Sequence, residues 1–114
     1  CIFANVEPDE QVRLINAACG FDWSIAELMK SGERAWNLKR AINNRMGLTR
    51  ANDKLPKALL TPFPDGGSKG FVPDIEAMLV AYYQHRGWDM ETGKPTREKL
   101  LELGLEDVAK DLWG

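Results

Sequence analysis

The sequence begins with a cysteine, Cys1, and the chemistry open to its thiol depends on what precedes it. Its position has three interpretations: a processed N-terminal nucleophile, an accidental chain end, or a residue from inside a longer chain. As a free terminus, Cys1 could attack a substrate with its own α-amine as the base. Enzymes of that kind need a large, strand-rich sandwich, and this chain of 114 residues offers neither the length nor the strands.

The second possible role of Cys1 is metal binding, which one cysteine cannot accomplish alone. An iron–sulfur cluster takes four thiolates, and zinc usually takes four ligands. Cys19, the other cysteine, falls on an apolar helical face and is interpreted as a small core residue. If Cys1 binds a metal, the remaining ligands therefore lie upstream of this chain.

The other residues of chemical interest do not form a complete active site. His85 falls late on an amphipathic helix beside Arg86, which is typical of a solvated or hydrogen-bonded surface histidine. The stretch PDGGSKG, residues 64–70, lacks the spacing of a phosphate-binding loop and the strand that should precede one, so we expect a plain flexible turn. No CxxC, HExxH or GxSxG motif is present.

Two further groups of residues at helical spacing are expected to stabilise the fold and not to carry chemistry. One group is expected in core or interface packing: Trp23, Trp36, Tyr82 and Tyr83. A second group predicts a solvated or salt-bridged helix face: Glu33, Arg34, Lys39 and Arg40.

Composition narrows the class of protein. The apolar and charged contents, 44% and 28%, are those of an ordinary globular domain. A formal net charge of −2 argues against a nucleic-acid-binding domain, which usually carries a basic excess. The apolar runs are only a few residues long, so we expect no membrane span. Two cysteines make no disulfide framework, which fits a reducing compartment and predicts a cytoplasmic protein.

Helical signals run through most of the chain. A helix is expected to start at Pro8 and to stop at Gly20, and a longer one to start at Ser24, where Glu27 completes a capping box. The longer helix ends at Gly47, and whether it is interrupted at residues 31–32 is left open.

The second half of the chain combines a long loop with three shorter helices. Residues 48–73 are rich in proline and glycine, with one helical turn expected around LPKALL. Further helices are expected from Pro73 to Gly87, from Thr96, and at the C-terminus. No strand alternation persists. We therefore predict an all-α, irregular, orthogonally packed domain with one long Pro/Gly-rich loop, spanning residues 1–114.

Three segments, in order, carry a resemblance to a known family. The run GERAWNLKRAINNRMGLTRANDKLPKALLTPFPDGGSKGFV fits the pattern GER-x-WN-x-x-R-x-x-N-x-R-x-G followed by D-x-LP-x-x-(F/L)-x-x-P-x-PDG-x-x-KG. The run MLVAYYQHRGWDMETGKPTREKLLELGLEDVAKDL fits an ending of the form ML, YY, RGWD, EKL, ELGL. From Phe21 to Leu112 the chain thus resembles the C-terminal region of the tungsten-containing aldehyde:ferredoxin oxidoreductases.

The resemblance gives Cys1 a role. In that family a cysteine just upstream of the corresponding helices is the fourth ligand of a 4Fe-4S cluster, and the other three ligands come from a CxxCxxxC motif far earlier in the chain. Cys1 stands at that cysteine's place, so the resemblance implies that it is a metal-binding and cofactor-binding residue. The acid–base residues of the family lie in segments outside this one, and no catalytic residue is expected here.

The resemblance also implies an activity for the longer protein. Family members oxidise aldehydes to carboxylic acids at a tungsten bis-pterin, with molybdenum as the alternative metal, and pass electrons to ferredoxin. Expected partners are the rest of its own chain, an aldehyde, ferredoxin and a possible homodimer mate, with no nucleic acid and no membrane. The 114 residues alone should bind neither cofactor and should be inactive. The alternative is a free-standing helical interaction module without catalysis, and the sequence encoded upstream of Cys1 discriminates between the two.

Overall fold

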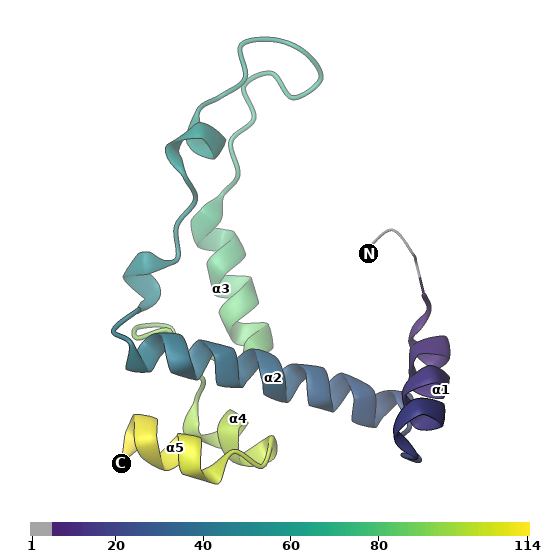
Figure 1. Cartoon of the computed structure of the whole chain (residues 1–114). Coiled ribbons are helices and arrows are strands. Elements are labelled where there is room, and N and C mark those ends of the chain that lie inside the picture. The colour runs from purple at the N-terminus through teal and green to yellow at the C-terminus, as the bar shows by residue number, and fades with distance from the viewer. Residues whose placement is uncertain (1–5) are drawn as a thin grey trace.

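The computed structural model describes residues 6–114 and shows a helical chain (Figure 1). Its elements, in order, are α1 (Pro8–Cys19), α2 (Ile25–Arg45), the short 3-10 turns η2 (Arg50–Asn52) and η3 (Lys57–Leu60), α3 (Ile75–Arg86), α4 (Arg97–Glu102) and α5 (Glu106–Trp113). Within the described residues, extended backbone pairs only as two isolated bridges, Phe63 with Lys69 and Trp88 with Pro95. The all-α prediction is confirmed.

The longest helix, α2, is the support for the other elements. Its first turn carries the predicted capping box: Ser24 Oγ accepts from the Glu27 N–H at 3.3 Å, and the Glu27 carboxylate accepts from the Ser24 N–H at 2.6 Å. The helix continues without a break through residues 31–32. It closes at Met46, followed by Gly47 at φ +93°.

The helix α1 is attached to α2 through a short, ordered connection. Gly20 adopts the left-handed conformation predicted for a residue beyond a helix end, and its N–H donates to Asn16 O. The Asn16 side chain then donates to Trp23 O at 2.9 Å and accepts from the Trp23 N–H at 3.0 Å. These two bonds fix the angle at which the chain turns from α1 into α2.

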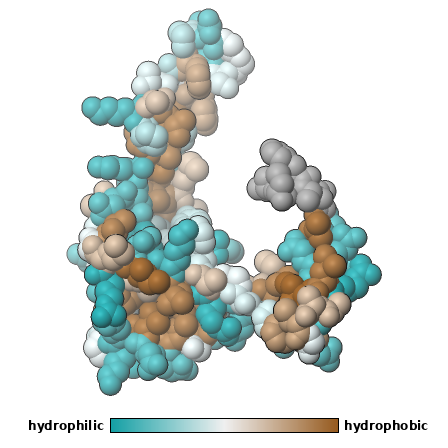
Figure 2. Space-filling model, viewed as in Figure 1, coloured by the Kyte–Doolittle hydropathy of each residue, from teal (hydrophilic) through white to brown (hydrophobic). Residues whose placement is uncertain are grey.

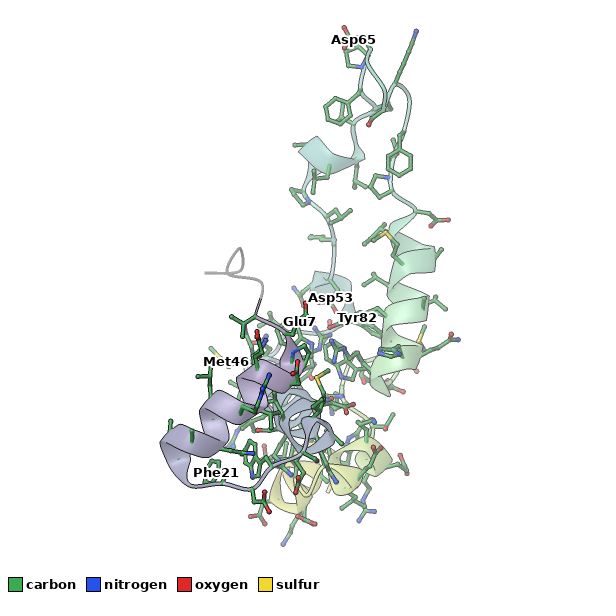
Figure 3. The ribbon with its side chains drawn as sticks, turned by 90° about the vertical axis from the view of Figure 1, so that its right-hand side faces the viewer. Glu7, Phe21, Met46, Asp53, Asp65 and Tyr82 are labelled. Atoms are coloured by element: carbon green, nitrogen blue, oxygen red, sulfur yellow. The ribbon has the colours of Figure 1, made fainter. Side chains whose placement is uncertain are left out.

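Between α2 and α3 the chain makes a long excursion, residues 54–74, which we call the arm. It holds η3, the one helical turn predicted for LPKALL, and its far end is exposed throughout residues 61–72. The tip is the predicted turn, closed by the Gly70 N–H donating to Phe63 O at 3.0 Å. Figure 3 shows Asp65 at this tip, far from Asp53 at the base of the arm.

The buried core is small for a chain of this length. It comprises Val12, Ala41, Tyr83, Trp88, Leu100, Leu103 and Ala109. The radius of gyration is 18.2 Å, whereas a compact domain of this length has about 13 Å. Apolar side chains are visible on the arm, along α2 and on α1 (Figure 2). The molecule is therefore open, with much apolar surface in contact with solvent.

One core prediction is wrong. Cys19 is exposed, not buried in a core. The reason is that α1 buries only Val12, so residues at helical spacing from Val12 stay at the surface. In residues 6–114, no helix combines the length and the apolar composition that crossing a membrane requires.

Candidate functional site

The predicted metal ligand, Cys1, lies outside the described residues. Within residues 6–114 no group of three or more His, Cys, Asp or Glu side chains is arranged to hold a metal ion. The described cysteine, Cys19, is at the surface, at the far end of α1 from the segment that carries Cys1. The described side chains therefore do not form a 4Fe-4S site by themselves.

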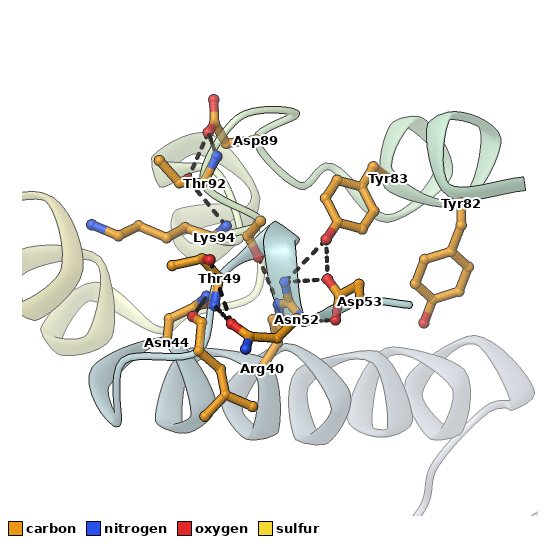
Figure 4. Close-up of polar contacts among 12 residues, drawn as sticks. Arg40, Asn44, Thr49, Asn52, Asp53, Tyr82, Tyr83, Asp89, Thr92 and Lys94 are labelled. Atoms are coloured by element: carbon orange, nitrogen blue, oxygen red, sulfur yellow. Dashed lines mark hydrogen bonds and ion pairs between the residues drawn. The ribbon is translucent and has the colours of Figure 1, made fainter. Parts of the chain in front are cut away.

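The strongest polar cluster of the structure surrounds Arg40, which comes from the middle of α2 (Figure 4). Its Nη1 donates to Asp53 Oδ1 at 2.9 Å and its Nη2 to Asp53 Oδ2 at 2.6 Å, a two-point ion pair. Its Nη2 also reaches the Tyr83 hydroxyl at 3.0 Å, and its Nε donates to Gly93 O at 2.7 Å. The Tyr83 hydroxyl in turn donates to Asp53. Arg40 is thus buried with each of its three nitrogens bonded.

The charges of this cluster are stabilised against the cost of burial. Burial disfavours the charged form of Asp53, but the hydrogen bonds from Arg40 and Tyr83 outweigh it and hold the pKa of the carboxyl below its usual value. Burial also opposes the charge of Arg40, and the bonds to Asp53 still raise its pKa. Burial and the hydrogen bond to Asp53 raise the pKa of Tyr83 to about 12. At neutral pH the cluster is an ion pair with a neutral phenol.

Packing holds the guanidinium of Arg40 from the other side. Its Cζ lies 4.7 Å from the centre of the Trp88 ring, and the Trp88 indole donates to Asn37 Oδ1 at 2.8 Å. Gly93, at φ +74°, comes so close that an added Cβ would lie 2.2 Å from Arg40 Nη2. The cluster therefore joins α2, the base of the arm, α3 and the turn before α4. Because its polar groups are mutually satisfied, its role is to position these elements.

The predicted salt-bridged face of α2 can now be compared with the contacts of Arg40. Salt bridging is confirmed for Arg40 and for Glu33, whose carboxylate lies 3.2 Å from Lys99 Nζ. Burial of Arg40 was not predicted. The spacing in the sequence shows only that Arg40 falls on the same helical face as Asn37, three residues earlier; the structure shows that Asn37 is buried. A charged residue on such a face needs a buried partner, and Asp53 is that partner.

A second group of side chains lines an open cleft between α1, α2 and α3. The cleft has a volume of about 640 Å³, and its lining includes Pro8, Gln11, Met29, Trp36, His85 and Arg86. We call it the α1–α3 cleft. His85 is exposed there, which confirms its interpretation as a surface histidine.

The aromatic residues of the cleft hold Arg86 in place. The Trp36 indole donates to the Tyr82 hydroxyl at 2.7 Å. The Arg86 Cζ lies 5.3 Å from the centre of the Tyr82 ring and 5.9 Å from that of Trp36. Of the predicted aromatic group, Tyr83 is buried in the core, whereas Trp36 is 43% exposed at the cleft.

Comparison with known proteins identifies the family of this chain. Residues 1–105 match the family model described as "Aldehyde ferredoxin oxidoreductase, domains 2 & 3". The chain belongs to the aldehyde ferredoxin oxidoreductase family. It is 43% identical over 111 residues to the tungsten-containing aldehyde ferredoxin oxidoreductase of Pyrococcus horikoshii, and 41% identical over 111 residues to that of Thermococcus kodakarensis.

These matches cover 94% of this chain but only 18% of each of the two relatives. The chain therefore spans about a fifth of the length of the oxidoreductases it matches. The segment shared with the family contains both Arg40 and Asp53, the ion pair that holds the arm to α2.

Proposed function

We propose that this chain is the C-terminal helical part of a tungsten-pterin, iron–sulfur oxidoreductase that oxidises aldehydes to carboxylic acids and passes the electrons to ferredoxin. The observation that carries the proposal is the family match, in which relatives named tungsten-containing aldehyde ferredoxin oxidoreductases are 41–43% identical over nearly the whole chain. Oxidation of an aldehyde to its acid takes an oxygen from water and releases two protons and two electrons. When bound, the tungsten pterin and the cluster would supply that redox chemistry.

In this proposal Cys1 is the fourth thiolate of a 4Fe-4S cluster, and its other three ligands come from the upstream part of the polypeptide. Cys1 lies in the segment directly before α1, which the Asn16 bonds join to α2. A thiolate in that segment is therefore linked through α1 to the helical framework. Such a link would limit the movement of a cluster ligand, whose position affects electron transfer.

The rest of the chain is proposed to wall one side of the cofactor and substrate cavity. In support, the described residues expose large apolar side chains that a domain normally covers: Leu14, Met29, Met46, Phe63, Phe71 and Met78. The Arg40 cluster holds α3 and the arm at a set angle to α2, so the wall would have one shape. A cytoplasmic location and a homodimer remain part of the proposal.

The test uses the full-length protein with Cys1→Ala, with Cys19→Ala as the matched control because Cys19 is exposed and ends α1. The Cys1 variant is expected to lose the visible absorption of the cluster, part of its iron, and aldehyde-dependent reduction of ferredoxin. The Cys19 variant is expected to keep all three. Unchanged iron and activity in the Cys1 variant would refute the ligand assignment. A wild-type protein that binds no tungsten and oxidises no aldehyde would refute the function.

A further inference from the structure

Among the described residues, Arg86 is the arginine that is partly buried and still lacks an acceptor. Five arginines hold one within residues 6–114: Arg13, Arg34, Arg40, Arg45 and Arg50. Arg97 is exposed, so water can accept its hydrogen bonds. Arg86 takes part in none of the ion pairs formed among the described residues, and its Nε is buried without a hydrogen-bond partner. Because the chain's own atoms already cover that nitrogen, an added acceptor can reach only the two terminal Nη nitrogens, which form no ion pair within the described residues.

The guanidinium of Arg86 is held ready for that acceptor. The rings of Tyr82 and Trp36 flank it, and the bond between the Trp36 indole and the Tyr82 hydroxyl keeps the rings in place. Stacking on ring faces leaves the edges of the guanidinium plane free to donate hydrogen bonds. A planar pair of acceptors, as in a carboxylate, matches two parallel N–H donors.

The cleft itself does not provide this carboxylate. Glu33 also lines the cleft, but its carboxylate is paired with Lys99 at 3.2 Å. His85 is the other titratable group facing the cleft, and it adds no negative charge. The positive charge of Arg86 therefore has no counter-charge from α1, α2 or α3 in the described residues.

The shape and polarity of the cleft indicate a polypeptide segment as its occupant. Besides its polar residues, the cleft is lined by Pro8, Leu28, Met29 and Trp36, and Met29 is 62% exposed. A small anion would leave this apolar surface in contact with water, whereas a segment with apolar residues around one acid would cover both. The chain spans only 18% of the length of its relatives. Under the proposed function a longer polypeptide would precede α1, whose first residue Pro8 lines the cleft.

We propose that the α1–α3 cleft seats a segment of the upstream part of this polypeptide, in which an aspartate or glutamate forms a two-point ion pair with Arg86. The proposal rests on the family membership of the chain and not on its redox activity. The docking of this segment and the proposed redox function can therefore be refuted independently. The pair would clamp the end of α3 to the rest of the protein. It would also cover the apolar surface of Met29 and Trp36.

The experiment introduces Arg86→Lys in the full-length protein and couples amines to adjacent carboxylates with a water-soluble carbodiimide. Arg97→Lys is the matched control, because Arg97 is exposed and has no ion-pair partner among the described residues. Peptide mass spectrometry is expected to find position 86 joined to an acidic residue upstream of Cys1. Mixing isotopically light and heavy protein tests whether the cross-link lies within one molecule. A cross-link only to residues 6–114, only to a second copy, or at the same low level as the control would overturn the proposal.

A second measurement, of arginine reactivity, uses the wild-type protein and so does not depend on whether the Arg86 variant folds. In the full-length protein, Arg86 is expected to react with phenylglyoxal at least roughly tenfold more slowly than Arg97, because an ion pair and burial protect it. Equal reactivity overturns the proposal. Protection that appears only after acetate or phosphate is added would also overturn it, since it would show a small-anion site in place of a polypeptide segment.

Discussion

The buried Arg40 and the partly buried Asp53 form a two-point ion pair, with Nη1–Oδ1 at 2.9 Å and Nη2–Oδ2 at 2.6 Å. Arg40 belongs to α2, and Asp53 follows η2 directly before the arm begins, so the pair fixes where the arm starts relative to α2. Tyr83 from α3 and Gly93 from the turn before α4 bond to the same guanidinium. One side chain of α2 thus determines how three later segments are arranged around it.

Replacing Asp53 by Asn should destabilise this junction. The change keeps the shape but removes the charge that compensates Arg40, and leaving a buried cation unpaired costs about 3 kcal/mol. Hydrogen exchange in the full-length protein should show faster opening at the base of the arm and at residues 88–95. Asp9→Asn is the matched control: its pair with Arg13 is exposed, so the expected cost is below about 0.5 kcal/mol. Equal effects of the two changes would contradict the central place of the Arg40 pair.

The same cluster predicts a pH profile for local stability. The pKa of Asp53 is lowered in the folded state, so its contribution is complete above the ordinary value of 3.8 and is lost as the pH falls through the lowered pKa. The pKa of Tyr83 is raised from 10.0 to about 12, so its contribution is complete below pH 10.0 and is lost as the pH rises toward 12. Local hydrogen exchange at residues 88–95, corrected for intrinsic rates, should therefore show a plateau between these limits.

The variant Tyr83→Phe separates the alkaline limb of this profile, assigned to Tyr83, from the acid limb, assigned to Asp53. It removes the phenol, so the loss of protection above pH 10.0 should disappear while the acid limb remains. An alkaline limb that persists unchanged in the variant would assign the effect to another group.

Gly93→Ala should be among the most damaging small substitutions in the chain. The residue sits at φ +74°, and the added Cβ would meet Arg40 Nη2 at 2.2 Å and the Tyr83 hydroxyl at 2.9 Å. Left-handed backbone strain of about 1–2 kcal/mol then adds to overpacking of about 1–3 kcal/mol. Gly104→Ala is the control, because Gly104 has φ +69° and no atom within 4 Å of the added Cβ, so only the backbone cost applies. Thermal melts of the two full-length variants that coincide would contradict the close approach at Gly93.

Ser24→Ala tests the start of α2. The loss of the side-chain acceptor for the Glu27 N–H should cost about 1 kcal/mol and increase fraying of the first turn of α2. Ser68→Ala, in the exposed tip of the arm, should leave exchange in α2 unchanged. Equal exchange in the first turn of wild type and the Ser24 variant would show that tertiary contacts, not the cap, hold that end.

Local sequence signals predicted the helices well because the forces that start and stop a helix act within a few residues. Ser24 with Glu27 marked the start of α2, and Gly20 and Gly87 marked two ends through their left-handed backbone. The single turn around residues 57–60 and the exposed turn at residues 64–70 also follow from local composition. A prediction that needed a neighbouring element could go wrong, as it did for Cys19, whose apolar helical face was assumed to be covered and is exposed.

By itself, the sequence determined the helical class, most of the helix ends and the family. The tertiary structure alone decided that Arg40, Asp53, Tyr83 and Gly93 meet, and that Arg86 stands between two rings with its Nε unpaired. The physical reason is separation along the chain. Capping and periodicity involve residues three or four apart, whereas Arg40 and Gly93 come together only once α2, α3 and the arm have packed.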